Sequence, residues 1–245
     1  RTAAEGESGP APKAMVARVA QSIIFEDRDF LVIDKPAGIA SHGGSGVAFG
    51  AIELLRAARP DETLELAHRL DRDTSGVLVL ARRRAALTSL QELIRDGRIT
   101  KQYLALLHGH PKRARFDVNV PLRKFDLQGG ERMVRVSDDG KPALTAFKVI
   151  GNYADASLAE VTLYTGRTHQ IRVHAQHAGH PLAGDEKYGL REFNKALRDF
   201  GLRRLFLHAA RFEFELNGKT HSFSAPLAPD LANVLDRLPT GKTAR

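Results

Sequence analysis

An uninterrupted apolar run, Val77–Ala81, begins immediately after the polar segment His68–Gly76, and this junction sets the firmest limit on how the chain can fold. The run has the length and composition of a buried strand. The residues before it, Asp-Thr-Ser-Gly, favour turns in which side chains bond to the backbone. We therefore expect Asp71 to lie just before a tight bend, at the mouth of a buried strand.

Asp71 is the first candidate for a functional residue. Its neighbours Arg69 and Arg72 carry guanidiniums, which can keep a carboxylate ionised and directed at a ligand. A plainer interpretation is that an acidic residue at such a junction only caps a backbone N–H, and Asp73 fits that role better because Thr-Ser-Gly follows it. A second segment, Thr165–His174, is equally dense in polar groups within an apolar frame, which favours a functional site.

The composition is that of a folded protein with a substantial core. Of the 245 residues, 42% are hydrophobic. There is no cysteine, which excludes disulfides and thiolate metal sites and favours the cytoplasm over a secreted location. No segment has the length of a membrane span or the pattern of a signal peptide.

The net charge of +8 favours a polyanionic partner. Basic residues gather in four places: Arg82–Arg84, Lys112 to Arg115, Arg123–Lys124 and Arg203–Arg204. Each cluster alone is more often a solvated face, but several on one domain resemble a surface that contacts phosphates. A membrane surface is the weaker interpretation, because no basic segment is also strongly amphipathic.

Hairpins and separate helices are predicted along the chain, without a regular alternation of strand and helix. The hairpins are expected at residues 22–34 and, around Asn217-Gly218, at residues 212–223. Helices are predicted over 48–58, 82–96, from 168 or 169 onward and over 229–238; strands are predicted over 99–107 and within 115–164, with a charged loop at 124–140. This pattern predicts an α+β fold with a mixed, mainly antiparallel sheet flanked by helices and loops. Residues 1–14 indicate a linker or disordered tail, and residues 15–245 a single domain.

Three further features raise the question of a ligand site. The Gly-rich segment 43–50 lacks the strand–Gly-x-Gly-x-x-Gly–helix context and the P-loop lysine, so we expect a flexible loop and no nucleotide site. The four histidines between residues 169 and 180 have no acidic or thiol partner at matching spacing, so no metal is expected. Lys35, at a strand end, is either a phosphate contact or a solvated side chain.

Several motifs together resemble one known family, the A-type ribosomal large subunit pseudouridine synthases. Its three successive motifs look like His68–Asp71 with Thr74–Gly76, then Lys101–Ala105, then Gly166–Arg172. Its opening and closing motifs are similar to Ile24–Asp27 with Val32–Gly38, and to Leu205–Ala209. The resemblance covers roughly residues 23–238 in the family's order and spacing, which is far more specific than any single match.

The resemblance implies a pseudouridine synthase fold and an isomerase that converts specific uridines of large-subunit (23S) ribosomal RNA to pseudouridine, with no cofactor. Asp71 would be the catalytic carboxylate, either as a nucleophile at C1′ or as the base that takes the C2′ proton. Arg172 would keep that carboxylate ionised. Tyr103, which sequence alone would assign to packing, would stack on the target base, and Arg69 would help to fill the gap left by the flipped uridine.

The resemblance also implies the partners. We expect ribosomal RNA of the large subunit as the partner, no membrane and no metal, and a monomer in the cytoplasm. Many family members carry a small S4-type RNA-binding domain ahead of the catalytic domain, and no sequence of that kind is present in these residues.

Two other classes of protein stay open. A hydrolytic glycosidase could use Asp71 and Asp73 as its carboxylate pair, although residues so close across a turn are poorly placed on opposite sides of a bond. A non-catalytic RNA-binding module would explain the charge, but not an aspartate framed by Arg69 and Arg172.

Overall fold

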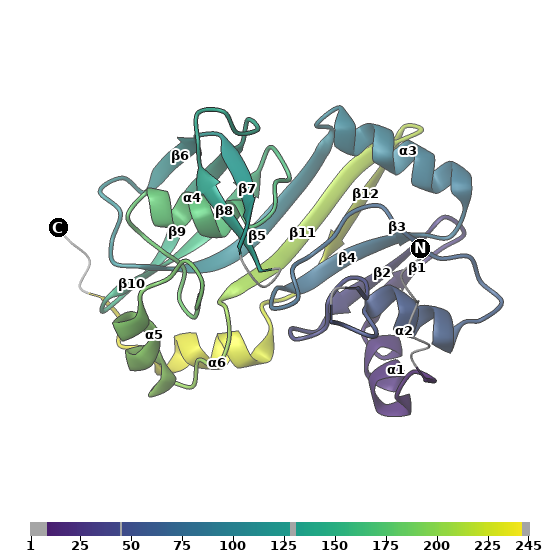
Figure 1. The fold of residues 1–245 in the computed structure, drawn as a ribbon, viewed down its shortest axis with the longest axis horizontal. Coiled ribbons are helices and arrows are strands. Elements are labelled where there is room, and N and C mark those ends of the chain that lie inside the picture. The colour runs from purple at the N-terminus through teal and green to yellow at the C-terminus, as the bar shows by residue number, and fades with distance from the viewer. Residues whose placement is uncertain (1–8, 45, 128–130, 242–245) are drawn as a thin grey trace. The chain divides into compact units, whose positions relative to one another are not determined.

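The computed structural model describes residues 9–44, 46–127 and 131–241 (Figure 1). The chain divides into two compact units, residues 1–92 (unit 1) and residues 93–245 (unit 2), and the boundary falls within helix α3, Arg84–Arg95. Residues 1–8 of the predicted tail lie outside the described residues, and helix α1, Lys13–Ala20, begins before the predicted end of that tail. Within the described ranges, no helix is long and apolar enough to cross a membrane.

A small antiparallel sheet forms the centre of unit 1. Its strands are β1 (Ile23–Glu26), β2 (Phe30–Lys35) and β4 (Ser75–Ala81), and the short strand β3 (Glu65–Leu66) pairs with the end of β4. The hairpin predicted at residues 22–34 is therefore confirmed. Helix α2 (Ala51–Ala58) packs against α1, and it begins later than the predicted helix over 48–58.

Strand β4 confirms the prediction made for the apolar run. Every residue from Ser75 to Ala81 is buried, and so are Phe30 to Ile33 of its partner β2. Each fully buried Val or Leu side chain contributes about 1.5–3 kcal/mol to folding. The start of β4 is thus fixed in place, and with it the end of the segment that carries Asp71.

An antiparallel sheet also forms the centre of unit 2. Its strands lie in the order β12–β11–β5–β10–β9–β6. They are β5 (Ile99–His108), β6 (Arg115–Asn119), β9 (Leu144–Tyr153), β10 (Ala156–Leu163), β11 (Leu207–Leu216) and β12 (Lys219–Ser224). The unit also has helices α4 (Gln170–His177), α5 (Arg191–Arg198) and α6 (Pro229–Arg237). The predicted α+β fold with a mainly antiparallel sheet is confirmed.

Local turn chemistry explains the hairpin β11–β12. Asn217 and Gly218 both have positive φ, 53° and 72°, which is the backbone that a tight two-residue hairpin turn requires. The helices predicted over 82–96 and 229–238, and the one from about residue 169, are confirmed with slightly later starts or earlier ends.

Two regions differ from the sequence-based expectation. The predicted charged loop at 124–140 is wrong over much of its length, because β7 (Leu122–Asp126) and β8 (Arg132–Val136) pair there as an antiparallel ribbon. Charged side chains fill the exposed positions of both strands and hide their alternation. Helix α5 was not predicted, because it is short and buries only Phe193 and Leu197.

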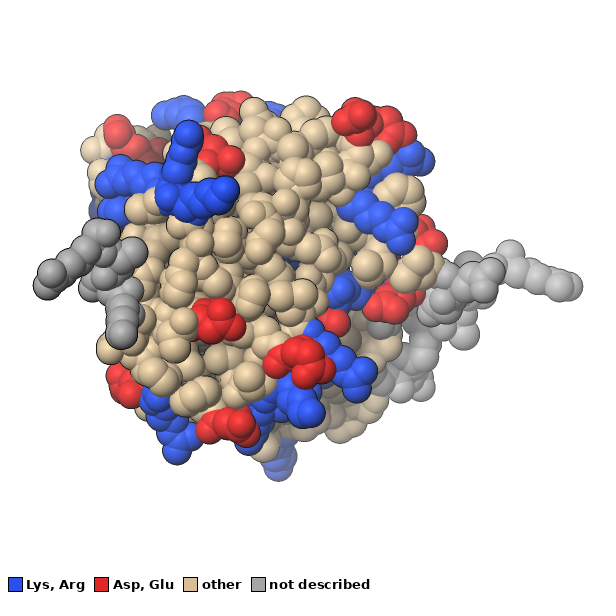
Figure 2. All heavy atoms as spheres, turned by 90° about the vertical axis from the view of Figure 1, so that its left-hand side faces the viewer, with Lys and Arg blue, Asp and Glu red and all other residues tan. Residues whose placement is uncertain are grey.

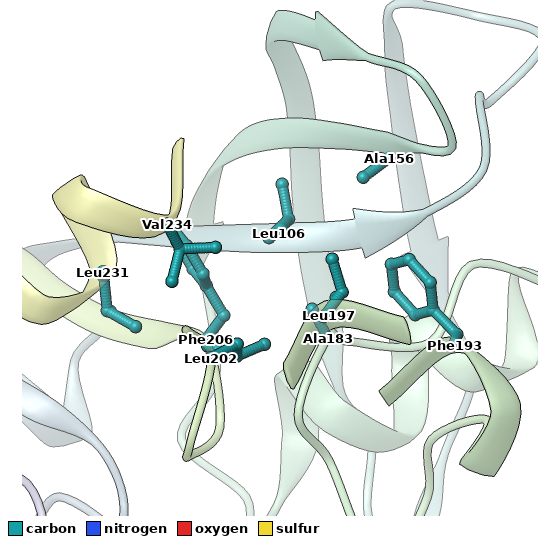
Figure 3. Close-up of a cluster of buried hydrophobic side chains, with 9 residues drawn as sticks. All are labelled: Leu106, Ala156, Ala183, Phe193, Leu197, Leu202, Phe206, Leu231 and Val234. Atoms are coloured by element: carbon teal, nitrogen blue, oxygen red, sulfur yellow. The ribbon is translucent and has the colours of Figure 1, made fainter. Parts of the chain in front are cut away.

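A buried hydrophobic cluster joins helices α5 and α6 to the end of β5 in unit 2 (Figure 3). Its members are Leu106, Ala156, Ala183, Phe193, Leu197, Leu202, Phe206, Leu231 and Val234. Ala183 is bonded on both sides, since its N–H donates to Leu106 O at 2.8 Å and its carbonyl accepts the N–H of Phe206 at 2.9 Å. The cluster therefore fixes the backbone that leads into Gly184 and Asp185.

Candidate active site

Asp71 lies at the start of a tight turn, as predicted. The N–H of Thr74 donates to the carbonyl of Asp71 at 3.1 Å, and Arg72 and Asp73 occupy the exposed middle of the turn. Strand β4 begins at the next residue, Ser75. The Asp71 side chain is half-buried at the point where the chain enters its most buried strand.

The residue before Asp71 is held by a buried serine. The hydroxyl of Ser41 donates to the carbonyl of Leu70 at 2.8 Å, and it accepts the N–H of Leu70, also at 2.8 Å. Both polar groups of the Leu70 backbone are satisfied by one side chain from the loop after β2. Since buried backbone groups must be paired, this exchange fixes where Asp71 begins.

Lys35 holds the other end of the turn. Its side chain is fully buried, and its ammonium donates to the carbonyls of Pro36 at 2.9 Å and Arg72 at 3.1 Å, and also to that of Ile39. The N–H of Gly38 donates to the same Arg72 carbonyl at 2.8 Å. The interpretations of Lys35 as a phosphate contact or a solvated side chain are therefore wrong, because its charge is enclosed by carbonyls and joins two loops.

The side chains around Asp71 alternate between the interior and solvent. His68 accepts the N–H of Val79 on its Nε2 at 2.9 Å, and Leu70 is buried. Arg69, between them, is exposed. Arg69 is thus available to a large ligand, while the backbone on either side of it is fixed.

Tyr103 lies in the interior of the unit 2 sheet. It is on β5, opposite Val161 of β10 and Ala209 of β11, and it is 8% exposed. The predicted strand with Tyr103 inside it is confirmed, and its stacking role stays a prediction.

Arg172 forms a buried ion pair that the sequence did not predict. Its Nε and Nη2 donate to the two carboxylate oxygens of Asp185, each at 2.8 Å, and the Asp185 side chain is 0% exposed. Asp185 also accepts the N–H groups of Lys187 and Tyr188, both at 3.0 Å. Burial alone would raise the pKa of Asp185, but the hydrogen bonds and charge of Arg172, together with these two N–H groups, outweigh it and lower that pKa below its usual value.

The ring of Tyr188 makes a cation–π contact with the same guanidinium. The ring centroid of Tyr188 lies 5.1 Å from the Arg172 guanidinium carbon. The Tyr188 hydroxyl accepts the N–H of Val134 at 3.0 Å and lies 2.7 Å from Nδ1 of His169. Because His169 precedes α4 in the left-handed region, with φ of 54°, this contact also fixes the start of the helix that carries Arg172.

Sequence reasoning missed Asp185 and Tyr188, although a signal was present. The segment Gly184–Gly189 reads Gly-Asp-Glu-Lys-Tyr-Gly and directly follows the apolar Leu182-Ala183. It is the same arrangement of a polar turn next to an apolar run that pointed to Asp71.

The predicted site residues therefore fall into two groups. Arg69 and Asp71 share one segment of unit 1, and Tyr103 and Arg172 lie on β5 and α4 of unit 2. The support of Asp71 by Arg172 stays a prediction.

Several of the predicted basic clusters are neutralised by acidic neighbours. Arg82 pairs with Glu26 at 3.3 Å and with Glu62 at 3.0 Å, and Arg204 pairs with Asp230 at 2.7 Å. Over the described residues, Lys112 to Arg115 and Lys124 have no ion pair and are exposed. The face in Figure 2 shows basic and acidic side chains next to one another and is mostly uncharged, so the excess positive charge does not form a uniform patch on it.

The histidine segment provides no metal site in the part of the chain that the structure describes, where no group of three or more His, Cys, Asp or Glu could hold an ion. His174 is buried, with Nδ1 2.7 Å from the Thr145 hydroxyl and Nε2 2.9 Å from the Val120 carbonyl.

Residues 29–177 match the family described as RNA pseudouridylate synthase. The chain belongs to this family, and it is therefore an isomerase that acts on RNA. This membership favours the isomerase over the glycosidase and the non-catalytic binding module.

Named relatives carry the comparison further. A protein of Pasteurella multocida (strain Pm70), named ribosomal large subunit pseudouridine synthase C, is 49% identical over 232 residues, which is 94% of this chain and 71% of the relative. The protein of the same name in Escherichia coli (strain K12) is 51% identical over 228 residues, which is 91% of this chain and 72% of the relative.

Solved structures confirm the predicted pseudouridine synthase fold. Human RNA Pseudouridylate Synthase Domain Containing 1 has a TM-score of 0.76 at 27% identity, covering 91% of this chain and 90% of that one. Human RNA Pseudouridylate Synthase Domain Containing 4 has a TM-score of 0.76 at 25% identity, covering 94% and 98%.

Proposed function

We propose that this enzyme isomerises specific uridines of large-subunit ribosomal RNA to pseudouridine, with Asp71 as its catalytic carboxylate. The names of the relatives support the choice of RNA. The observation that carries the role of Asp71 is the way its backbone is held, by Ser41 at Leu70 and by Lys35 at Arg72. Such a rigid frame around a half-buried carboxylate suits a group that must meet a reacting atom.

The reaction exchanges the N1–C1′ glycosidic bond for a C5–C1′ bond; the proton on C5 leaves to solvent, and the freed N1 takes up a proton. Asp71 would act either by attacking C1′ or by taking the proton from C2′, and both routes need it ionised. Arg172, which keeps its charge at any working pH, would maintain that state.

Two further residues would handle the flipped nucleotide. Tyr103 would stack on the target base, which is worth roughly 1–3 kcal/mol for a base on an aromatic ring. Arg69, exposed beside Asp71, would help to fill the space that the uridine leaves in the RNA. Because flipping costs least where a base is unpaired, a uridine in a loop is the expected target.

The proposal includes no cofactor and no metal, because the isomerisation is redox-neutral and the base stays in the active site. We propose that the enzyme acts as a monomer. We also propose that it acts in the cytoplasm, since the relatives named for large-subunit ribosomal RNA are bacterial proteins.

Tritium release from C5-labelled uridine in large-subunit ribosomal RNA tests the proposal. We expect the parent to release tritium and Asp71→Asn to release at least about 1,000-fold less, while RNA binding is retained. Asp73→Asn is the matched control, since it removes a carboxylate from the exposed middle of the same turn, and it should keep most of the activity.

Either of two results would overturn the proposal. One is a parent that binds the RNA and releases no tritium. The other is an equal loss of activity in Asp71→Asn and Asp73→Asn, which would mean that the turn matters and the Asp71 carboxylate does not. Mapping the modified uridines on the product identifies the target sites. Shortening the RNA around one of these sites then gives the shortest stem-loop that the enzyme accepts.

A further inference from the structure

Two lysines of this chain, Lys35 and Lys101, are wholly or partly buried, but only one of the two ammonium groups has hydrogen-bond partners among the described residues. The ammonium of Lys35 is enclosed by three carbonyl oxygens, as a structural lysine should be. Lys101 on β5 is also partly buried, yet within the described residues its ammonium makes no hydrogen bond and no ion pair. Burial lowers the pKa of Lys101, and no acidic neighbour opposes that effect.

The position of Lys101 relates it to the predicted base-stacking residue. Lys101 and Tyr103 are two apart on β5, so their side chains leave the same face of the strand with about 6.6 Å between their backbone positions. The pairing is regular along this stretch, with Leu163 opposite Lys101 and Val161 opposite Tyr103 on β10. A nucleotide whose base lies on Tyr103 therefore has its backbone within reach of a lysine side chain at this position.

One neighbour of the ammonium is the backbone of Gly166. A Cβ on Gly166 would lie 3.8 Å from Nζ of Lys101, so Nζ lies beside the backbone of an exposed residue that has no side chain to cover it. Gly166 is also the first residue of the segment that leads into α4 and Arg172. An ammonium that is partly desolvated and has no partner is costly unless a ligand provides the counter-charge.

We propose that Lys101 binds a phosphodiester of the target nucleotide, so that the RNA supplies the anion that the protein does not. The proposal rests on the function proposed above, since it needs the base on Tyr103. A phosphate suits the position because lysine is a compact point charge, and because the phosphate is charged both before and after the reaction. The other anion available is an oxygen of the uracil ring, which gains charge only after the N1–C1′ bond breaks.

The test compares the parent with Lys101→Met and Lys101→Arg on the shortest stem-loop RNA that the parent modifies. For Lys101→Met we expect binding about tenfold weaker at low salt, and a slope of log K against log salt that is lower by about 0.7–0.9, the value for one phosphate contact. Turnover at saturating RNA should stay close to that of the parent, and Lys101→Arg should keep the salt dependence. Lys219→Met, an exposed lysine on strand β12, is the matched control and should leave the slope unchanged.

Thermal unfolding separates this role from a structural one. Removing a partly buried charge that has no protein partner should leave the melting temperature of Lys101→Met equal to or above that of the parent. A structural lysine would give the opposite result.

Neutral phosphates identify the contact on the RNA. A methylphosphonate in place of the phosphate on the 5′ or the 3′ side of the target uridine should weaken binding by the parent at one of the two sites, and should not weaken Lys101→Met further at that site.

Three results would overturn the proposal: an unchanged salt slope, a loss confined to turnover, which would point to the uracil oxygen, or additive losses with both methylphosphonates. A parent that is inactive on the RNA refutes the proposed function instead, so the two failures are distinct.

Discussion

The turn that carries Asp71 and the helix that carries Arg172 are held by different kinds of contact. In unit 1, Ser41 binds both backbone groups of Leu70, and Lys35 binds the carbonyl of Arg72. In unit 2, Asp185 and Tyr188 contact the Arg172 side chain itself. The backbone on either side of Asp71 is therefore held by side chains that bind main-chain groups, whereas the guanidinium of Arg172 is held by the Asp185 carboxylate and the Tyr188 ring.

The largest effect should come from removing the partner of a buried charge. Asp185→Ala removes the buried carboxylate that binds two nitrogens of Arg172, whose side chain is only 13% exposed, and we expect a loss of about 3 kcal/mol in the free energy of unfolding. Urea denaturation measures it. Glu186→Ala is the control, since the adjacent Glu186 makes, among the residues that the structure describes, only a long and exposed pair with Arg198, and it should change stability by less than about 0.5 kcal/mol. Equal effects of the two substitutions would contradict the role of the buried pair.

A smaller loss of stability, but a clear loss of activity, should follow at the turn. Ser41→Ala leaves the N–H and carbonyl of Leu70 without their partner, which should cost about 2 kcal/mol. Because Asp71 is the next residue, we also expect turnover to fall at least about tenfold. Ser22→Ala removes a similar serine-to-carbonyl bond elsewhere in unit 1, and it should leave turnover unchanged. A normal turnover in Ser41→Ala would show that the turn keeps its geometry without the hydroxyl.

At low pH, the parent and a variant with a neutral residue at position 185 should become equally stable. The pKa of Asp185 is lowered in the folded protein: burial raises it, but Arg172 and the backbone N–H groups of Tyr188 and Lys187 together outweigh that effect. Its stabilisation is therefore complete above the unfolded pKa of about 3.9, and is lost as the pH falls through the lowered value. In urea denaturation, the gap between the parent and Asp185→Asn should be constant from pH 7 to about 5 and should narrow below about pH 4. A gap that widens in acid would contradict this assignment.

The smallest expected effect separates the two contacts of Tyr188. Tyr188→Phe keeps the ring beside Arg172 but removes the hydroxyl, which accepts the Val134 N–H and contacts Nδ1 of His169, at a cost of about 1 kcal/mol. Tyr188→Leu removes the ring as well, and should cost a further 0.5–1 kcal/mol or so for the lost cation–π contact. If the two variants are equally stable, the contact between the ring and Arg172 adds nothing measurable, and Tyr188 stabilises the protein through its hydroxyl alone.

How far the sequence predicts the structure depends on how local the determinants are. The turn at Asp71 and the hairpin at Asn217-Gly218 follow from neighbouring residues, and both were predicted correctly. The strand β4 followed from its own apolar run. In these places each residue's preference agrees with the fold around it.

The parts that were missed depend on contacts between distant segments. Nothing near Arg172 indicates that its partner is Asp185, and the ribbon β7–β8 is hidden because its exposed positions carry charges. In that ribbon, Phe125 is flanked by Arg123 and Arg135, whose guanidinium carbons lie 5.2 and 5.5 Å from its ring centroid. The two arginines contact Phe125 at positions where a strand pattern would be expected to show apolar and polar residues in alternation, so the sequence does not show that pattern.

The hydrogen bonds that hold the Asp71 turn join residues far apart in the sequence, and this has a kinetic consequence. The bond from Lys35 to Arg72 spans 37 residues, and that from Ser41 to Leu70 spans 29. Neither can form until strands β2 and β4 have paired, and such non-local pairing is slow in folding. The turn is therefore completed late, and partly folded chains in which β2 and β4 are unpaired would lack it. The N–H of Leu70 should accordingly exchange with solvent only when that pairing opens, so a single amide reports whether the molecule is competent to act.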